Sequence, residues 1–276
     1  MAGKNKGLDF EHAVMYAATS RINEPRDKEN QEAFEEASKK WPSIEKTIQD
    51  KATELVLNMA PVRDKQSYYK SFKKMSGGTE PKTDILFVKG GKKYKCSMKW
   101  GDSFQLTSSG IDTSVQVLTK VLKKVASQMG KNNMSTVELG TLQLIIEQIA
   151  NKFENNSGTM SAPEAERLMK DVNKAGGLNE QLQDILGSRR SPSGAKAYDA
   201  FKFELTKECM TGELTFANDK DKAADHLLTE NGLKPIDEKA VREVMKKAGV
   251  RFSKKGRGKD KVTGVRKNAI SIRYEV

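Results

Sequence analysis

A carboxylate, a hydroxyl and an ammonium group occur in one short stretch of the chain, residues 83–100, at a spacing that could bring them to a common ligand. Asp84 stands near the start of this stretch, and Ser97 and Lys99 stand near its end. Residues that pair directly across two antiparallel strands have Cβ atoms about 5 Å apart, so their side chains can share one ligand. The stretch is therefore a candidate site if its two halves form a β-hairpin.

The residues between these groups predict such a hairpin. Gly90-Gly91 lies at its centre, and glycine readily adopts the positive φ angles that a two-residue turn needs. When the residues that flank the two glycines are paired, counting outward places Asp84 across from Ser97, with Lys99 two residues further along the same face. The pattern thus predicts one face that presents an acid, a hydroxyl and a base at its open end.

The other face of the hairpin has the composition of a protein core. It consists of Ile85, Phe87, Tyr94, Cys96, Met98 and Trp100. Leu86 and Val88 share the face of Asp84, because side chains alternate along a strand. We therefore expect the Asp84 face to be partly covered as well.

The two strands together resemble the motif of the PD-(D/E)xK nuclease superfamily. Thr83-Asp84 stands where Pro-Asp is usual, and Ser97-Met98-Lys99 stands where (Asp/Glu)-x-Lys is usual. In that family the first Asp and a second acid hold Mg²⁺, and the Lys positions or activates the attacking water. The resemblance implies an α/β (α+β) fold of the restriction-endonuclease type, with a mixed sheet flanked by helices.

Two further segments resemble parts of the same family. Residues 7–14, GLDFEHAV, are similar to the opening helix G-x-x-F-E-x-x-V, which implies that Glu11 is a further acid of the metal site. Residues 105–110, QLTSSG, resemble the segment in which the family turns from the Lys strand into its next helix. The resemblance covers about residues 7 to 125.

Ser97 departs from the family pattern, because it cannot supply the negative charge of the usual acid. Some restriction enzymes of the superfamily also carry Ser-x-Lys and take a carboxylate from the helix that follows. Asp112, thirteen residues after Lys99 and at the expected N-cap of that helix, fits this arrangement better than Asp102. The resemblance therefore implies Mg²⁺ (or Mn²⁺) held by Glu11, Asp84 and Asp112. The catalytic residues that it implies are Glu11, Asp84, Ser97 and Lys99.

The formal net charge of +12 favours polyanionic partners, nucleic acid first and anionic membranes second. Basic residues interleave with aromatic ones within residues 62–75, two arginines lie in the loop 189–194, and a cationic loop is expected from residue 254 onward. Each group has a plain alternative, which is a solvated helix face or a solvated loop. The candidate DNA contacts are Lys65, Tyr68, Lys70, Lys73, Lys74, Gln105, Arg189, Arg190, Lys254, Lys255, Arg257 and Lys259.

Hydrophobic periodicity predicts a chain rich in helices. The helices are expected over residues 9–20, 27–40, 43–59, 62–75, 112–129, 135–153, 162–174, 179–186, 195–210, 219–229 and 236–247. Beyond the central hairpin, strands are expected at 212–216, 250–253 and 269–276, the last two forming a C-terminal hairpin. We expect a nuclease-like core over residues 1–130, with a helical insertion at 27–76. Residues 131–276 then form a mostly helical region, either separate or packed on the core as one domain.

Composition excludes several other classes of protein. Two cysteines and two histidines are too few for a disulfide framework or a Cys/His zinc cluster. No apolar run approaches the roughly 18 residues of a membrane span, and the start of the chain lacks a signal-like apolar region. A cytoplasmic location is expected, and it would be the host cytoplasm if the weak resemblance of residues 207–216 and 269–276 to bacteriophage proteins holds.

Two functions follow from these observations. The first is an Mg²⁺-dependent DNA endonuclease, and similar enzymes are often homodimers because two DNA strands need two sites. The alternative is a basic DNA-binding or phage virion or assembly protein that keeps a degenerate nuclease-like fold without catalysis. In that case Asp84 and Lys99 form only a cross-strand ion pair, worth about 0 to 1 kcal/mol.

Overall fold

The computed structural model divides the chain into two compact units, each of which is described by itself. Unit 1 comprises Met1–Phe104 and Met210–Ala240, and unit 2 comprises Gln105–Cys209 and Val241–Val276. The boundary expected at residue 130 falls inside unit 2. The residues that the structure describes are 5–21, 28–59, 69–71, 80–129, 140, 144–145, 147–148, 161–187, 192–259, 262, 264 and 266–276.

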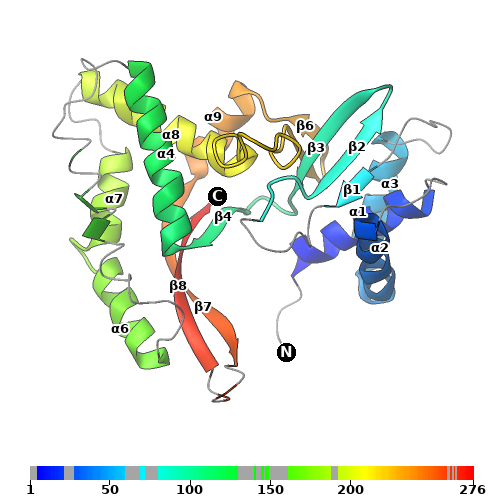
Figure 1. Cartoon of the computed structure of the whole chain (residues 1–276), viewed down its shortest axis with the longest axis horizontal. Coiled ribbons are helices and arrows are strands. Elements are labelled where there is room, and N and C mark those ends of the chain that lie inside the picture. Colours follow the sequence, from blue (N-terminus) through cyan, green and yellow to red (C-terminus); the bar gives the residue numbers. More distant parts are fainter. Residues whose placement is uncertain are drawn as a thin grey trace. The chain divides into compact units, whose positions relative to one another are not determined.

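Unit 1 is built on a mixed sheet whose strands come from two distant parts of the chain (Figure 1). The order of the described strands is β1-β2-β3-β5-β6, and β3 and β5 run parallel while the other neighbours are antiparallel. The strands are β1 (Tyr69–Ser71), β2 (Ile85–Lys89), β3 (Lys92–Met98), β5 (His226–Thr229) and β6 (Gly232–Pro235). All of unit 2 except its last segment therefore intervenes in sequence between β3 and its parallel neighbour β5.

The β2–β3 hairpin has the register that the sequence predicts. Lys89 pairs with Lys92 and Ile85 pairs with Cys96. Gly90 and Gly91 both have positive φ angles, 55° and 76°, as a two-residue turn of the favoured twist requires. This turn leaves no freedom to slip by one residue, a shift that would exchange the two faces of the hairpin.

Helices α1 (Lys6–Arg21), α2 (Lys28–Lys40) and α3 (Lys46–Met59) contribute to the core of unit 1 with the predicted apolar face of the hairpin. From that face Ile85, Phe87, Cys96 and Met98 are buried, and Tyr94 and Trp100 pack against the same cluster. The ring of Phe10 from α1 lies 5.2 Å from that of Trp100. Leu86 and Val88 are also buried, in a separate cluster. Both faces of the hairpin are thus covered, as expected.

Unit 2 contains a second, antiparallel sheet with the described strand order β4-β8-β7. Its strands are β4 (Gln105–Gly110), β7 (Gly249–Lys259) and β8 (Arg266–Glu275). Its helices are α4 (Ile111–Met129), α6 (Ala162–Asn173), α7 (Leu178–Gly187), most of α8 (Pro192–Thr211) and most of α9 (Glu238–Lys247). The C-terminal hairpin and most of the predicted helices are confirmed, and the fold is of the mixed α and β class.

Several predicted elements are wrong, and tertiary pairing explains two of them. Residues 219–229 form turns and then β5 in place of a helix, because Asp225 N–H donates to the Lys95 carbonyl at 2.9 Å and Lys99 N–H donates to the Leu228 carbonyl at 2.9 Å. Residues 69–71, inside a predicted helix, are strand β1 because they pair with β2.

Two local predictions also differ from the structure. Residues 105–110, for which no element was predicted, form strand β4, which pairs with β8. Residues 212–216 are turns in place of a strand, because Gly212 has a φ of +69° and its carbonyl accepts the Phe216 N–H at 2.8 Å. The expected cationic loop after residue 253 continues as strand β7 to Lys259. The predicted helix over 135–153 lies largely outside the described residues.

Among the residues described, the structure contains no helix that is both long enough and apolar enough to span a membrane.

Candidate functional site

The carboxylate of Asp84 is the centre of the site, because three groups of the neighbouring strand converge on one of its oxygens. Oδ2 accepts a hydrogen bond from the Met98 N–H at 2.6 Å and another from the Ser97 hydroxyl at 3.4 Å. The Lys99 Nζ lies 3.9 Å from the same oxygen. The acid, the hydroxyl and the base therefore come together as the hairpin register predicts.

Backbone bonds on two strands hold these side chains in place. The Asp84 N–H donates to the Cys96 carbonyl at 2.9 Å, which extends the β2–β3 ladder by one step beyond Ile85. On the other side, the Lys99 N–H donates to the Leu228 carbonyl of β5 at 2.9 Å. The Lys99 Nζ also donates to the Met98 carbonyl at 3.0 Å. The position of Lys99 thus depends on the parallel strand as well as on the hairpin.

The site is partly shielded but open to solvent. The Asp84 and Lys99 side chains are 19% and 22% exposed, so the pair is less screened than a surface ion pair and still reachable. The nearby Cys96 is fully buried, and this burial, together with the charges of Asp225 and Asp84, raises its pKa well above the usual value. The Cys96 thiol therefore stays protonated at neutral pH and is not a nucleophile of this site.

Thr83, directly before Asp84 in the chain, has a buried hydroxyl group. Its N–H donates to the Lys222 carbonyl at 3.1 Å, but its hydroxyl is buried and has no hydrogen-bond partner among the residues that the structure describes. Such a group costs free energy in a folded protein unless a ligand or water completes it.

Glu11 lies on α1, one residue after the buried Phe10 that contacts Trp100. The Glu11 side chain is half-buried. Asp112 is the second residue of α4, in unit 2, and its side chain lies outside the described part of the chain. Asp102 is exposed. Among the described side chains, no group of three or more His, Cys, Asp or Glu residues is close enough to hold a metal ion.

Glu230 is an acid beside the site that sequence reasoning missed. It follows β5 directly, and both oxygens of its carboxylate accept the Gly101 N–H, at 3.2 and 3.1 Å. Gly101 stands two residues after Lys99 in the chain, whereas Glu230 is 129 residues further on than Gly101. No local pattern could have identified Glu230, because only the parallel pairing of β3 with β5 brings it there.

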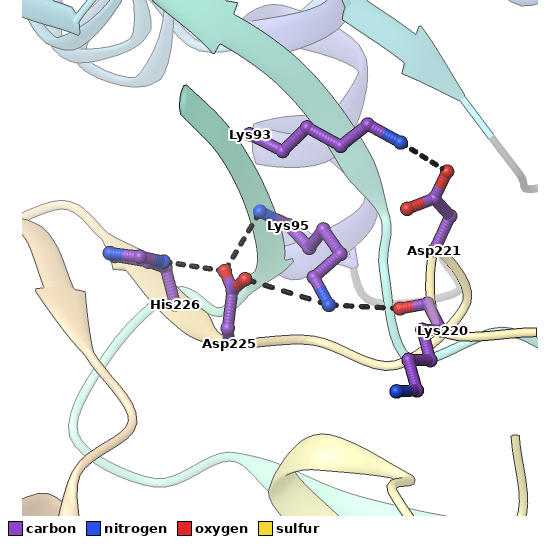
Figure 2. Close-up of polar contacts among 6 residues, drawn as sticks. All are labelled: Lys93, Lys95, Lys220, Asp221, Asp225 and His226. Atoms are coloured by element: carbon purple, nitrogen blue, oxygen red, sulfur yellow. Dashed lines mark hydrogen bonds and ion pairs between the residues drawn. The ribbon is translucent and has the colours of Figure 1, made fainter. Parts of the chain in front are cut away.

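A second polar cluster fastens β3 to the segment before β5, as Figure 2 shows. Asp225 Oδ1 accepts the Lys95 N–H at 2.9 Å and lies 2.5 Å from His226 Nδ1. The Lys95 Nζ donates to the Lys220 carbonyl at 2.9 Å and is 3.6 Å from Asp225 Oδ2, while Lys93 pairs with Asp221 at 2.7 Å. The contacts of Asp225 position the strand that carries Ser97 and Lys99, whereas the Lys93–Asp221 pair is close to half exposed and adds little.

The predicted DNA contacts fall on both units. Gln105 is exposed at the start of β4. Lys70 belongs to β1, and Lys254, Lys255, Arg257 and Lys259 belong to β7, although the side chains of these residues lie outside the described part. The remaining candidates also lie outside it, namely Lys65, Tyr68, Lys73, Lys74, Arg189 and Arg190.

No protein-family model, curated protein or solved structure matches this chain.

Proposed function

We propose that this chain is an Mg²⁺-dependent DNA endonuclease that hydrolyses phosphodiester bonds at the Asp84–Lys99 site. The observation that carries the proposal is the convergence of the Ser97 hydroxyl and the Lys99 ammonium on one oxygen of Asp84. The resemblance to the PD-(D/E)xK motif supports the reaction type. The net charge of +12 supports a polyanionic substrate.

The donor atoms at the site suit Mg²⁺ when DNA is bound with it. The site offers the Asp84 carboxylate, the Ser97 hydroxyl and the Met98 carbonyl, and Mg²⁺ prefers oxygen ligands. Mg²⁺ is commonly held by only one or two carboxylates together with waters and substrate phosphates. Asp84 would hold the ion, and Glu11, which also belongs to unit 1, is the proposed further acid. When bound, the ion would neutralise the charge that grows on the phosphate and make water a better nucleophile.

The other residues act on the phosphate and on the attacking water. The Lys99 ammonium is held by a carboxylate at 3.9 Å and by a carbonyl at 3.0 Å, so it is already oriented toward Asp84. When a scissile phosphate lies beside Asp84, the same ammonium stabilises its developing negative charge or holds the water. Ser97 orients the Asp84 carboxylate through its hydrogen bond but adds no charge of its own.

Further parts of the proposal follow from the reaction. A homodimer would place one site on each DNA strand, and the substrate would be met in the cytoplasm, or in the host cytoplasm for a phage protein. The alternative function is a DNA-binding or virion protein without catalysis. It is favoured by Ser97 in place of an acid and by the absence of a three-acid group among the described side chains.

Nicking of supercoiled plasmid in Mg²⁺ or Mn²⁺ tests the proposal. Asp84→Asn keeps the shape of the side chain and an oxygen that accepts the Met98 N–H, but it removes the charge. Lys99→Met removes the ammonium, and we expect either change to lower the nicking rate about 10² to 10³-fold. DNA binding measured in EDTA should be retained.

The matched control is Lys93→Met, which removes a lysine from the same strand that pairs with Asp221 away from the site. Its nicking rate should equal that of the wild type. DNA binding by the wild type without any nicking in either metal would establish the non-catalytic alternative.

A further inference from the structure

In unit 2, strands β7 and β8 pair with each other beyond the part of β8 that pairs with β4. Strand β4 pairs with β8 only from Glu275 to Ser271. Strands β7 and β8 pair with each other much further, through Lys254↔Ile270 to Lys259↔Arg266. In the part of the chain that the structure describes, this outer half is thus a two-stranded ribbon, which we call the basic ribbon (254–259 and 266–270). Figure 1 shows β7 and β8 as the long paired arrows.

The inner and outer halves of the hairpin have different compositions. The inner half contains the buried side chains of Val250, Phe252, Ile272 and Tyr274, which belong to the core. The basic ribbon contains Lys254, Lys255, Arg257, Lys259, Arg266 and Lys267 and no acid. Residues 254–270 as a whole have seven basic residues and one acidic residue, a net +6, which is half of the +12 of the chain.

Glycines in β7 allow the ribbon backbone to come close to a partner. Gly256 and Gly258 alternate with Lys255, Arg257 and Lys259, and alternate positions of a strand belong to opposite faces. A strand position without a side chain is typical of places where another backbone approaches closely. The register shifts by one residue between Gly256 and Lys259, and such a bulge bends and twists the strand.

We propose that the basic ribbon binds double-stranded DNA by lying in a groove of the duplex. The major groove is about 12 Å wide and admits a two-stranded β-ribbon, whose strands are about 4.8 Å apart. The six residues from 254 to 259 span about 17 Å, enough to pass several successive phosphates on each side of the groove. Cations on both strands can then neutralise phosphates on both edges.

The distribution of charge favours duplex DNA over an anionic lipid surface. In β7 the cations follow the length of the ribbon, and in β8 they are Arg266 and Lys267. The connecting residues 260–265 contain Asp260 and Lys261 beside two valines, whereas a hairpin that enters a membrane needs a larger apolar end. The inference rests on the proposed function only in taking DNA as the partner, because the basic ribbon belongs to unit 2 and the Asp84 site belongs to unit 1. The two claims can therefore fail separately.

Fluorescence anisotropy with a labelled 20-base-pair duplex, in EDTA and over a series of salt concentrations, tests the ribbon. The ribbon variant replaces Lys254, Lys255, Arg257 and Lys259 with Gln. Each lost phosphate contact lowers the slope of log K against log salt by about 0.9. We expect the slope to fall by about 2 to 4 and the affinity at low salt to fall tenfold or more. Single-stranded DNA of equal length should bind the wild type more weakly than the duplex does. Its affinity should also fall less when the ribbon variant replaces the wild type.

A matched control removes the same charge elsewhere in unit 2. Lys170, Lys174, Lys246 and Lys247 are exposed on or beside α6 and α9, and their replacement with Gln should change the slope by less than about 1. Equal slopes for the ribbon and control variants would overturn the inference. So would normal duplex binding by the ribbon variant combined with lost binding to vesicles that contain anionic lipid. If the quadruple variant melts early, Lys254→Gln with Lys255→Gln alone should give about half the change in slope.

The outcome for the nuclease is read separately. Asp84→Asn should bind the duplex as the wild type does, whether or not the wild type nicks plasmid. A wild type that nicks, together with a ribbon variant that binds and nicks equally well, removes the ribbon inference and leaves the nuclease proposal intact.

Discussion

At the scale of single residues, Ser97 is the position where this chain differs most from the motif it resembles. Its hydroxyl lies 3.4 Å from Asp84 Oδ2, and Ser97 is buried. An acid at position 97 would put two carboxylates side by side, which is unfavourable unless a cation lies between them. The residue therefore offers a way to detect a metal site without measuring catalysis.

Ser97→Asp should lower the melting temperature in EDTA and make it strongly dependent on Mg²⁺ or Mn²⁺. We expect the wild type to shift much less with either ion in the absence of DNA, because the Ser97 hydroxyl adds no negative charge beside Asp84. Thermal melting of both proteins with and without metal measures the difference. A Ser97→Asp protein that melts at the same temperature with and without metal would argue against a cation position beside Asp84, and Ser97→Asn controls for the added volume.

Tyr274 is a second residue whose environment has a measurable consequence. Burial raises its pKa above the usual value of about 10, although its hydroxyl shares a hydrogen bond of 2.8 Å with Thr206. The folded protein therefore keeps the proton that the unfolded chain loses above pH 10, so the stabilisation is present below pH 10 and is lost as pH rises further. From pH 10 to pH 11 this residue should reduce the free energy of unfolding by about 1 kcal/mol, because Tyr274 of the unfolded chain is already half ionised at pH 10.

Urea unfolding of the wild type and of Tyr274→Phe at pH 8, 10 and 11 measures this dependence. The variant lacks the ionising group, so its stability should decline less steeply in the alkaline range. If the free energy of unfolding fell equally with pH in the two proteins, ionisation of Tyr274 would not be the cause of the lost stability at high pH.

At the scale of elements, replacing Asp225 should lower the free energy of unfolding more than replacing Asp221, although both residues lie on the segment before β5. Asp225 accepts a backbone N–H of β3 and contacts both Lys95 Nζ and His226. Asp221 makes an ion pair with Lys93 in which both side chains are close to half exposed. Asp225→Ala should lower the free energy of unfolding by about 1 to 3 kcal/mol, because it leaves the Lys95 N–H without its partner. Asp221→Ala should cost less than about 1 kcal/mol.

Chemical denaturation of the two variants separates these effects. Asp225→Ala should also reduce plasmid nicking, since it loosens the pairing that holds Lys99 against β5. Equal stabilities for the two variants would contradict the positioning role of Asp225.

Local patterns predicted those elements whose partners are close in the chain. The Gly90-Gly91 turn determines the register of β2 and β3, so the approach of Ser97 and Lys99 to Asp84 was predictable. The strand β5 was predicted as a helix, because its apolar residues are spaced suitably for a helix and its pairing partner lies about 130 residues earlier. The same separation in sequence explains why Glu230 was not predicted to lie beside the site. Strand pairing of this kind depends on the whole fold and leaves no local signal.

At the scale of the whole molecule, the two units of the structure divide the chain differently from the division expected from the sequence. The domain boundary expected at residue 130 was based on the extent of the resemblance. In the structure the chain passes from one unit to the other after residues 104, 209 and 240. Unit 1 needs 210–240 because β5 and β6 complete its sheet. Half of the net charge lies in residues 254–270, in unit 2, and the candidate chemistry lies in unit 1. Unit 1 is therefore the unit proposed to cleave DNA, and unit 2 is proposed to supply part of the DNA binding.

The most direct test of this account is the first-order rate of plasmid nicking in Mn²⁺ by the wild type and Asp84→Asn, purified in parallel. A contaminating nuclease would give the same rate in both preparations, so only the difference reports on this site. We expect nicking by the wild type and a rate lowered at least about 100-fold by Asp84→Asn, with equal DNA binding. Equal rates for the two proteins, or no nicking by either, would contradict it.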